Sequence, residues 1–172
     1  MQISIITAKS DNDVIGKAGG LPWSIPADER FLMEKIRHGY LLTGRKSFES
    51  NQGNTLFAGR QFVLITRHQD YDPGPGGSIA HSVEAGIAHA RAQQAKQLWI
   101  LGGAEIYQQA LPYTDEMYIT EIHTRIEGGD AFFPPIDPAD WKEQWRKPHP
   151  TDAENEYAYT FVYYRKRRNM GH

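Results

Sequence analysis

Apolar runs and helical patterns alternate along the first two-thirds of this chain. Six short apolar runs have the length and composition of buried strands: residues 2–8, 40–43, 62–66, 98–101, 117–122 and 157–164. Helical spacing occurs between them in four segments: residues 27–38, 45–50, 83–94 and 104–110. Such alternation builds a mostly parallel sheet with helices on both faces. We therefore expect one α/β domain with a central mixed sheet, and the last run predicts an antiparallel strand pair.

Composition narrows the class of protein further. A chain of 172 residues suits a single domain, and its net charge of −2 excludes a globally basic nucleic-acid binder. The absence of cysteine excludes disulfides and thiolate catalysis, and the seven histidines show no metal-binding spacing. The N-terminus enters a strand at once, without a signal peptide or membrane span. We expect a cytoplasmic protein without metal, membrane or nucleic-acid partners.

The two ends of the chain differ in character. Residues 1–165 contain no repeat or long linker, so we expect them to form the single domain. Residues 166–172 continue a run of basic residues and are predicted to be a basic C-terminal tail. A few charges on such a tail are usually only solvated.

The segment Leu21–Asp28 places an acid at the start of the first predicted helix. Proline suits a helix start because its missing N–H and fixed φ cost nothing there. Asp28 lies beside the apolar stripe of the helix, and a carboxylate at an apolar boundary is protonated more readily. Acids are also common in first helical turns because they complement the helix dipole. Glu29 flanks the same stripe, so spacing alone does not choose between the two acids.

Three predicted strands end in residues suited to a dinucleotide, since ligands collect at the carboxyl ends of parallel strands. The segment 41–47 ends in a glycine, two cations and a serine at a helix start, which favours a pyrophosphate. The segment 63–68 ends in a hydroxyl and cations suited to a further phosphate. The segment 99–107 carries paired glycines that permit close approach of a ligand. Together they indicate one cofactor site.

Two familiar phosphate-binding motifs do not fit. The G-x-G-x-x-G fingerprint of many dinucleotide-binding proteins is absent. Residues 39–47 come close to a P-loop, but an extra arginine precedes the lysine and the interior is apolar and strand-like. Phosphate-binding loops need small, flexible residues there, so we reject the kinase interpretation.

A set of motifs in a fixed order resembles the dihydrofolate reductase family. The matching segments span nearly the whole chain: residues 14–16, 21–23, 26–28, 44–50, 59–60, 100–103, 106–107, 118–120 and 129–134. The resemblance implies a reductase that transfers hydride from NADPH to 7,8-dihydrofolate and gives tetrahydrofolate for one-carbon metabolism. It also implies a monomer inhibited by antifolates. A pyrimidine reductase of the riboflavin-pathway type, another pterin reductase and a non-catalytic binding module are the alternatives.

The resemblance assigns a substrate site. Asp28 matches the pterin-binding acid of the family, Thr120 supports the same edge of the pterin, and Trp23 lies near the water that delivers a proton to N5. Arg60 would hold the α-carboxylate of the glutamate tail, because a planar guanidinium suits a bidentate carboxylate. The pterin and benzoyl pocket would be lined by Ile6, Leu32 and Phe57.

The resemblance also assigns a cofactor site. Three residues would hold the pyrophosphate: Arg45, Lys46 and Ser47. Three would lie at the 2′-phosphate side: Thr66, Arg67 and His81. Four would frame the nicotinamide, the last three on a mobile flap: Ala8, Ile15, Gly16 and Gly20. The remaining contacts would come from Leu101, Gly102, Gly103, Ala104, Glu105, Ile106 and Tyr107, and the Gly102–Gly103 bond is cis in the family.

Three positions depart from the pattern of the family. Leu32 stands where an aromatic residue is common, which predicts weaker stacking on the benzoyl ring. Residues 51–57 replace a shorter loop that contains proline, and this alters the wall of the tail groove. Gly128 and Gly129 add a residue before Asp130, and Ala131 replaces a common hydroxyl, so the loop that helps to close the flap is expected to behave differently.

Overall fold

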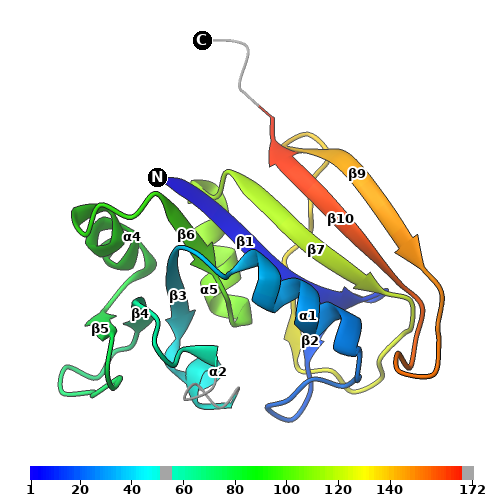
Figure 1. The fold of residues 1–172 in the computed structure, drawn as a ribbon, viewed down its shortest axis with the longest axis horizontal. Helices are drawn as coiled ribbons and strands as arrows, with labels where there is room; N and C mark the ends of the chain where they lie inside the picture. The colour runs from blue at the N-terminus through cyan, green and yellow to red at the C-terminus, as the bar shows by residue number, and fades with distance from the viewer. Residues whose placement is uncertain (51–55, 168–172) are drawn as a thin grey trace.

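The computed structural model describes residues 1–50 and 56–167 and contains a twisted sheet of eight strands (Figure 1). The strands lie in the order β5-β4-β3-β6-β1-β7-β10-β9. Their bounds are β1 Gln2–Ser10, β3 Tyr40–Gly44, β4 Phe62–Ile65, β5 Gly77–Ala80, β6 Gln97–Ile100, β7 Glu116–Ile122, β9 Trp141–His149 and β10 Tyr159–Lys166. The first six run parallel, whereas β10 is antiparallel to both β7 and β9. The predicted mixed sheet with an antiparallel C-terminal pair is confirmed.

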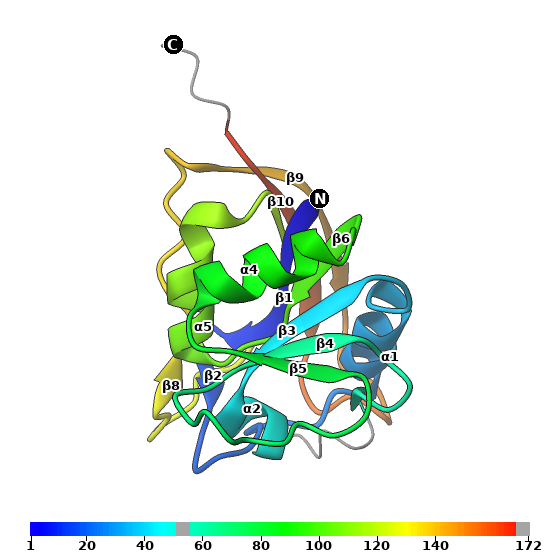
Figure 2. The same cartoon turned by 90° about the vertical axis from the view of Figure 1, so that its left-hand side faces the viewer.

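Helices cover both faces of this sheet, as predicted (Figure 2). Helices α1 (Pro26–Lys35) and α2 (Arg45–Ser50) pack on one face, and α4 (Val83–Ala92) and α5 (Ala104–Ala110) pack on the other. A short 3₁₀ helix, η1 (Leu111–Tyr113), follows α5. Neighbouring residues of β3 show why both faces are apolar: Leu41 packs in the cluster with Ile36, and Leu42 packs in the cluster with Ile87.

Helix α1 is shorter than the predicted 27–38 segment. It ends at Lys35, and the chain then turns toward β3 through Gly39, whose φ is +116°. The carbonyl of His38 accepts a hydrogen bond from Trp99 Nε1 at 3.0 Å, which holds this turn against β6. The turn that follows α1 is thus fixed by a tertiary contact as well as by the glycine.

Four strands were not predicted, because they lack an apolar run. Strand β9 is an edge strand in which only Trp141 is buried, and β5 is four residues long. The other two form a separate small sheet, β2 (Val14–Gly16) with β8 (Ala131–Phe132). Short and exposed strands are specified by their neighbours more than by their own sequence.

Strand β10 continues one residue into the segment assigned to the tail. Lys166 pairs with Trp141, and the Arg167 side chain donates a hydrogen bond to the carbonyl of Pro138 at 2.7 Å. The remaining tail residues, 168–172, lie outside the described part of the chain. Among the described helices, none has both the length and the apolar character needed to cross a membrane.

A buried carboxylate fixes the junction of β1, β7 and β10. Glu116 is 6% exposed and accepts three hydrogen bonds, from Gln2 Nε2 at 2.7 Å, Ser4 Oγ at 2.8 Å and the Tyr163 hydroxyl at 2.7 Å. These donors come from both neighbouring strands. A buried charge is tolerated when it is hydrogen-bonded in this way, so Glu116 ties the parallel and antiparallel parts of the sheet together.

We expect Glu116→Ala to lower the free energy of unfolding by about 2 kcal/mol, because three donors lose their shared acceptor. Urea unfolding followed by circular dichroism measures this change. Glu127→Ala is the matched control, since Glu127 lies on the surface with an 84% exposed side chain, and it should change stability by less than about 0.5 kcal/mol. Equal stability of the two variants would contradict the assigned role.

Candidate active site

Asp28, the acid at the end of the segment Leu21–Asp28, contacts a buried threonine of the sheet. Asp28 is the third residue of α1, and its Oδ1 accepts a hydrogen bond from Thr120 Oγ1 at 2.6 Å. Thr120 lies on β7, is 1% exposed and pairs with Ala8 of β1. Two residues that are 92 positions apart in sequence are thereby joined where α1 packs on the sheet.

The environment of Asp28 favours its protonated form. The residue as a whole is half-buried, but its carboxyl group is enclosed, and this burial raises the pKa from 3.8 to about 6. The Thr120 hydroxyl opposes the rise by bonding to the carboxylate, and the charge of nearby Glu29 adds to it. Glu29 itself is exposed. The structure thus separates the two acids that spacing alone did not.

Residues before α1 enclose the same acid. Trp23 and Ile25 are 7% and 2% exposed and belong to one cluster with Ala8. Ala8 is on β1, so the segment that leads into α1 packs directly against the strand beside Thr120. The structure therefore brings Trp23, Asp28 and Thr120 to one region.

An apolar surface extends from this acid toward the predicted tail-binding residue. Ile6, Leu32 and Phe57 belong to one cluster on the α1 face of the sheet. The Arg60 Nη2 donates to the carbonyl of Gly39 at 3.2 Å, just beyond the end of α1, and partial burial lowers the pKa of this guanidinium. Ile6, Leu32 and Phe57 thus form an apolar strip on the α1 face, and Arg60 lies at the turn that follows α1. Of the altered segment 51–57, residues 51–55 lie outside the described residues.

Two of the three predicted strand ends are joined by one carbonyl. The Gly102 oxygen accepts hydrogen bonds from the Gly44 N–H at 2.8 Å and from Thr43 Oγ1 at 3.1 Å. The Gly102–Gly103 peptide bond is cis, as the resemblance implied. Gly102 has a φ of +101°, and a Cβ there would lie 3.0 Å from the ring of Tyr107, so glycine is required.

Helix α5 starts directly after this turn. Tyr107 is buried and its hydroxyl donates to the Ile6 carbonyl at 3.0 Å, which anchors the helix to β1. Ile106 is buried as well, whereas Leu101 and Ala104 are half-buried and Glu105 is exposed. The predicted cofactor residues of this segment are therefore of two kinds: buried ones, such as Tyr107, that hold the turn in place, and more exposed ones, such as Glu105.

The third strand end lies beside the end of β3, because β4 pairs with β3. Thr66 is buried after β4, and its carbonyl lies 2.7 Å from His81 Nδ1. Arg67 is exposed next to it. After β3, Arg45 and Lys46 begin α2, where Arg45 pairs with Glu49 at 3.4 Å, and Ser47 is half-buried in the same turn.

The glycine-rich segment before α1 contacts the altered loop around Asp130. Gly16 and Ala131 pair in the small sheet, and Asp130 Oδ2 accepts a hydrogen bond from the Ala18 N–H at 3.0 Å. Ile15 packs against the main core, and the Gly20 amide bonds to the Lys17 carbonyl at 3.1 Å in a tight turn. The predicted flap residues and their partner loop therefore do touch.

The strand ends have the features that a dinucleotide phosphate needs. A Cβ at Gly103 would meet no atom within 4 Å, so the backbone there faces open space. No side chain caps the start of α5, which follows β6. The cations of α2 follow β3, the strand that pairs with β6 in the sheet. Free helix-start amides beside positive charge suit an anionic group, so these residues fit NADPH.

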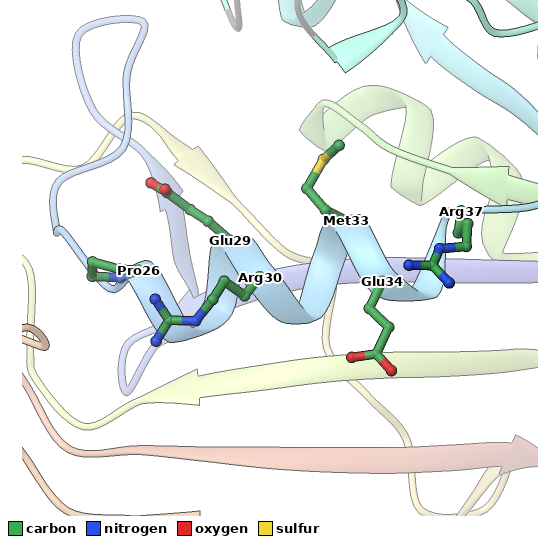
Figure 3. Close-up of a pocket in the computed structure, with 6 residues that line it drawn as sticks. All are labelled: Pro26, Glu29, Arg30, Met33, Glu34 and Arg37. Carbon is green, nitrogen blue, oxygen red and sulfur yellow. The ribbon is translucent and has the colours of Figure 1, made fainter.

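A separate hollow lies over the outer surface of α1. It has a volume of about 540 Å³ and is lined by Pro26, Glu29, Arg30, Met33, Glu34 and Arg37, as Figure 3 shows. None of these side chains is a predicted catalytic or cofactor residue. In the described part of the chain, no group of three or more acidic or histidine side chains is arranged to hold a metal ion.

Comparison with known proteins decides the family. The family model described as dihydrofolate reductase matches residues 2–166. The chain belongs to the dihydrofolate reductase family. It is 37% identical to a dihydrofolate reductase of Neisseria gonorrhoeae, with 95% of this chain and 98% of the relative covered. The figure is 34% for the enzyme of Staphylococcus haemolyticus, with 98% of each chain covered.

A solved structure agrees with this assignment. Dihydrofolate reductase from Enterococcus faecalis, complexed with NADP(H) and RAB-propyl, is similar with a TM-score of 0.86 and 34% identity, and 97% of each chain is covered. The sequence interpretation missed one element of this dihydrofolate reductase site. The loop between β9 and β10 contacts the start of α1, and no local pattern in residues 150–158 indicated it.

We expect Asp28→Asn to stabilise the folded protein at neutral pH. A folded-state pKa of about 6 against 3.8 means that ionising this group in the folded state is costly. The stability gained from its proton is full below pH 4 and is lost as the pH rises through 6. At pH 7.5 the variant should be more stable by about 3 kcal/mol. Urea unfolding at pH 7.5 and at pH 4 measures this, and a difference that does not shrink at pH 4 would contradict it.

Proposed function

We propose that this chain reduces 7,8-dihydrofolate to 5,6,7,8-tetrahydrofolate with NADPH. The observation that carries the proposal is the Asp28–Thr120 pair at 2.6 Å, in a chain of this family. A carboxyl group with a hydroxyl neighbour offers donors and acceptors to the amino group and N3 of a pterin. The solved relative that binds NADP(H) supports the choice of cofactor.

The substrate residues are assigned roles by this proposal. Asp28 binds the pterin edge and makes N5 readier to accept a proton from solvent, while Thr120 holds the carboxyl group in place. Trp23 closes the site around the water that carries the proton. The side chains of the apolar strip hold the pterin and benzoyl rings, and Arg60 binds the α-carboxylate of the tail.

The cofactor residues lie at the three strand ends. NADPH supplies the hydride when it is bound. The start of α2 holds the pyrophosphate, Thr66, Arg67 and His81 hold the 2′-phosphate, and the Gly102–Gly103 turn supports the cofactor at the end of β6. Ala8 and the flap frame the nicotinamide. Excluding water from this side protects the transferred hydride.

The decisive experiment is loss of absorbance at 340 nm when the protein is mixed with NADPH and dihydrofolate. We expect turnover and its inhibition by methotrexate. Ligand binding without turnover would instead indicate a binding module, and turnover only with other pterins or pyrimidines would indicate a different reductase. A monomeric, cytoplasmic enzyme without membrane or nucleic-acid partners stays a prediction.

Asp28→Asn should lower kcat with dihydrofolate at pH 7 by about 100-fold or more, which is the usual contribution of a positioned acid. Activity should recover in part at low pH, where the substrate is already protonated. Steady-state kinetics between pH 5 and pH 8 measures both effects. Glu29→Gln is the matched control, because Glu29 is exposed and lacks the bond to Thr120. Wild-type kcat in Asp28→Asn would refute the assignment.

Arg67→Ala should raise the KM for NADPH about tenfold or more, the usual effect of removing a charge-assisted hydrogen bond. The KM for NADH should stay nearly unchanged, because NADH lacks the 2′-phosphate. Parallel assays with the two cofactors measure the difference. An equal change for both would remove Arg67 from the phosphate site.

A further inference from the structure

Helix α1 does not cap its own N-terminus. Its N-cap residue is Ile25, whose side chain makes no capping hydrogen bond, and Pro26 at the first position has no N–H. The first free amide is that of Ala27, and Asn155 Oδ1 accepts its hydrogen bond at 3.1 Å. Asn155 lies 128 positions away, in the loop between β9 and β10. The cap of this helix is therefore supplied by a distant loop.

Asn155 is held rigidly in this position. The residue is 2% exposed, and its Nδ2 donates to Asp152 Oδ1 at 2.9 Å. The Asn155 backbone N–H bonds to the same oxygen at 2.8 Å, and Thr151 Oγ1 donates to the Asn155 carbonyl at 2.8 Å. Every polar group of Asn155 is thus used. A buried amide with all its bonds made has one orientation, which suits a group that sets the position of another element.

We propose that Asn155 is a positioning residue for the reduction, which fixes the first turn of α1 so that the Asp28 carboxyl group stays bonded to Thr120. The role rests on the proposed function of Asp28. Asp28 directly follows Ala27, so the capped amide and the acid share one turn. The same loop also holds the segment that precedes α1, because Glu156 Oε2 accepts a hydrogen bond from the Ser24 N–H at 3.2 Å.

The cap controls the acid through burial. The titratable groups that face Asp28 are Glu29 on α1, Tyr107 on α5 and Tyr159 on β10. None of them is a cation, and burial of the carboxyl group is the main cause of the raised pKa of Asp28. If the turn loosens, water reaches the carboxyl group and the pKa falls toward its ordinary value.

The test compares Asn155→Ala with Glu154→Ala. Glu154 is in the same loop and also contacts α1, but only through an exposed ion pair with Arg30 at 3.4 Å. We expect Asn155→Ala to lower kcat for dihydrofolate at pH 7 about tenfold and to leave the KM for NADPH within twofold, because the cofactor residues lie on other strand ends. Glu154→Ala should match the wild type in both constants. A general loss of structure would change both constants in Asn155→Ala.

The ionisation of Asp28 gives a readout that needs no turnover. Carbon-13 NMR of the Asp28 carboxyl group should show a pKa of about 6 in the wild type and a clearly lower pKa in Asn155→Ala. Unchanged kcat and an unchanged pKa in folded Asn155→Ala would overturn the proposal.

Asn155→Ser serves as the second variant if Asn155→Ala does not fold. Serine has no atom at the position of the Asn155 Oδ1, so the bond to Ala27 is lost, the same losses are expected and their absence is equally decisive. The two proposals fail differently. A wild type without dihydrofolate turnover, but with an Asp28 pKa that falls in Asn155→Ala, refutes the proposed function and retains the cap. Turnover that does not change when Asn155 is substituted supports the proposed function and refutes the positioning role of Asn155.

Discussion

The burial of the Asp28 carboxyl group against Thr120 depends on the parallel alignment of β1 and β7. Thr120 faces the acid because β7 lies beside β1 in register, with Ala8 and Thr120 opposite each other. The helix that carries Asp28 is placed by its packing on this sheet and by a cap from the loop after β9. The hydrogen bond between Asp28 and Thr120 therefore depends on the positions of the sheet, the helix and the loop together, because a shift of any of them would lengthen it.

Two carboxylates of this protein illustrate opposite uses of burial. Glu116 accepts hydrogen bonds from three donors, so its charge is well accommodated and it stabilises the sheet. Asp28 receives one side-chain hydrogen bond in an enclosed position, which raises its pKa to about 6. The second arrangement costs stability at neutral pH and raises the pKa of an acid at the proposed substrate site. The two groups differ in the number of donors that face them, and Glu116 also lies 3.8 Å from the Arg165 guanidinium.

The sequence predicted those parts of the fold that depend on local pattern. Apolar runs such as β3 and helical spacing such as α4 gave the right elements, and glycines after β6 marked a real turn. The exposed edge strand β9 has no such run and was missed. Spacing could not choose Asp28 over Glu29, and it gave no sign of Asn155. Both depend on contacts about a hundred positions apart, with Thr120 and with Ala27, which only the folded chain shows.

The bond from Arg60 to the Gly39 carbonyl has a consequence for the rate and selectivity of ligand capture. A long cationic side chain normally loses rotational freedom when an anion binds. Here the guanidinium already bonds to the backbone, and this turn is closely packed, because a Cβ at Gly39 would lie 3.0 Å from the Gln97 side chain. In the role proposed for Arg60, less rotational freedom remains to be lost on binding, which favours a ligand whose carboxylate reaches this side chain.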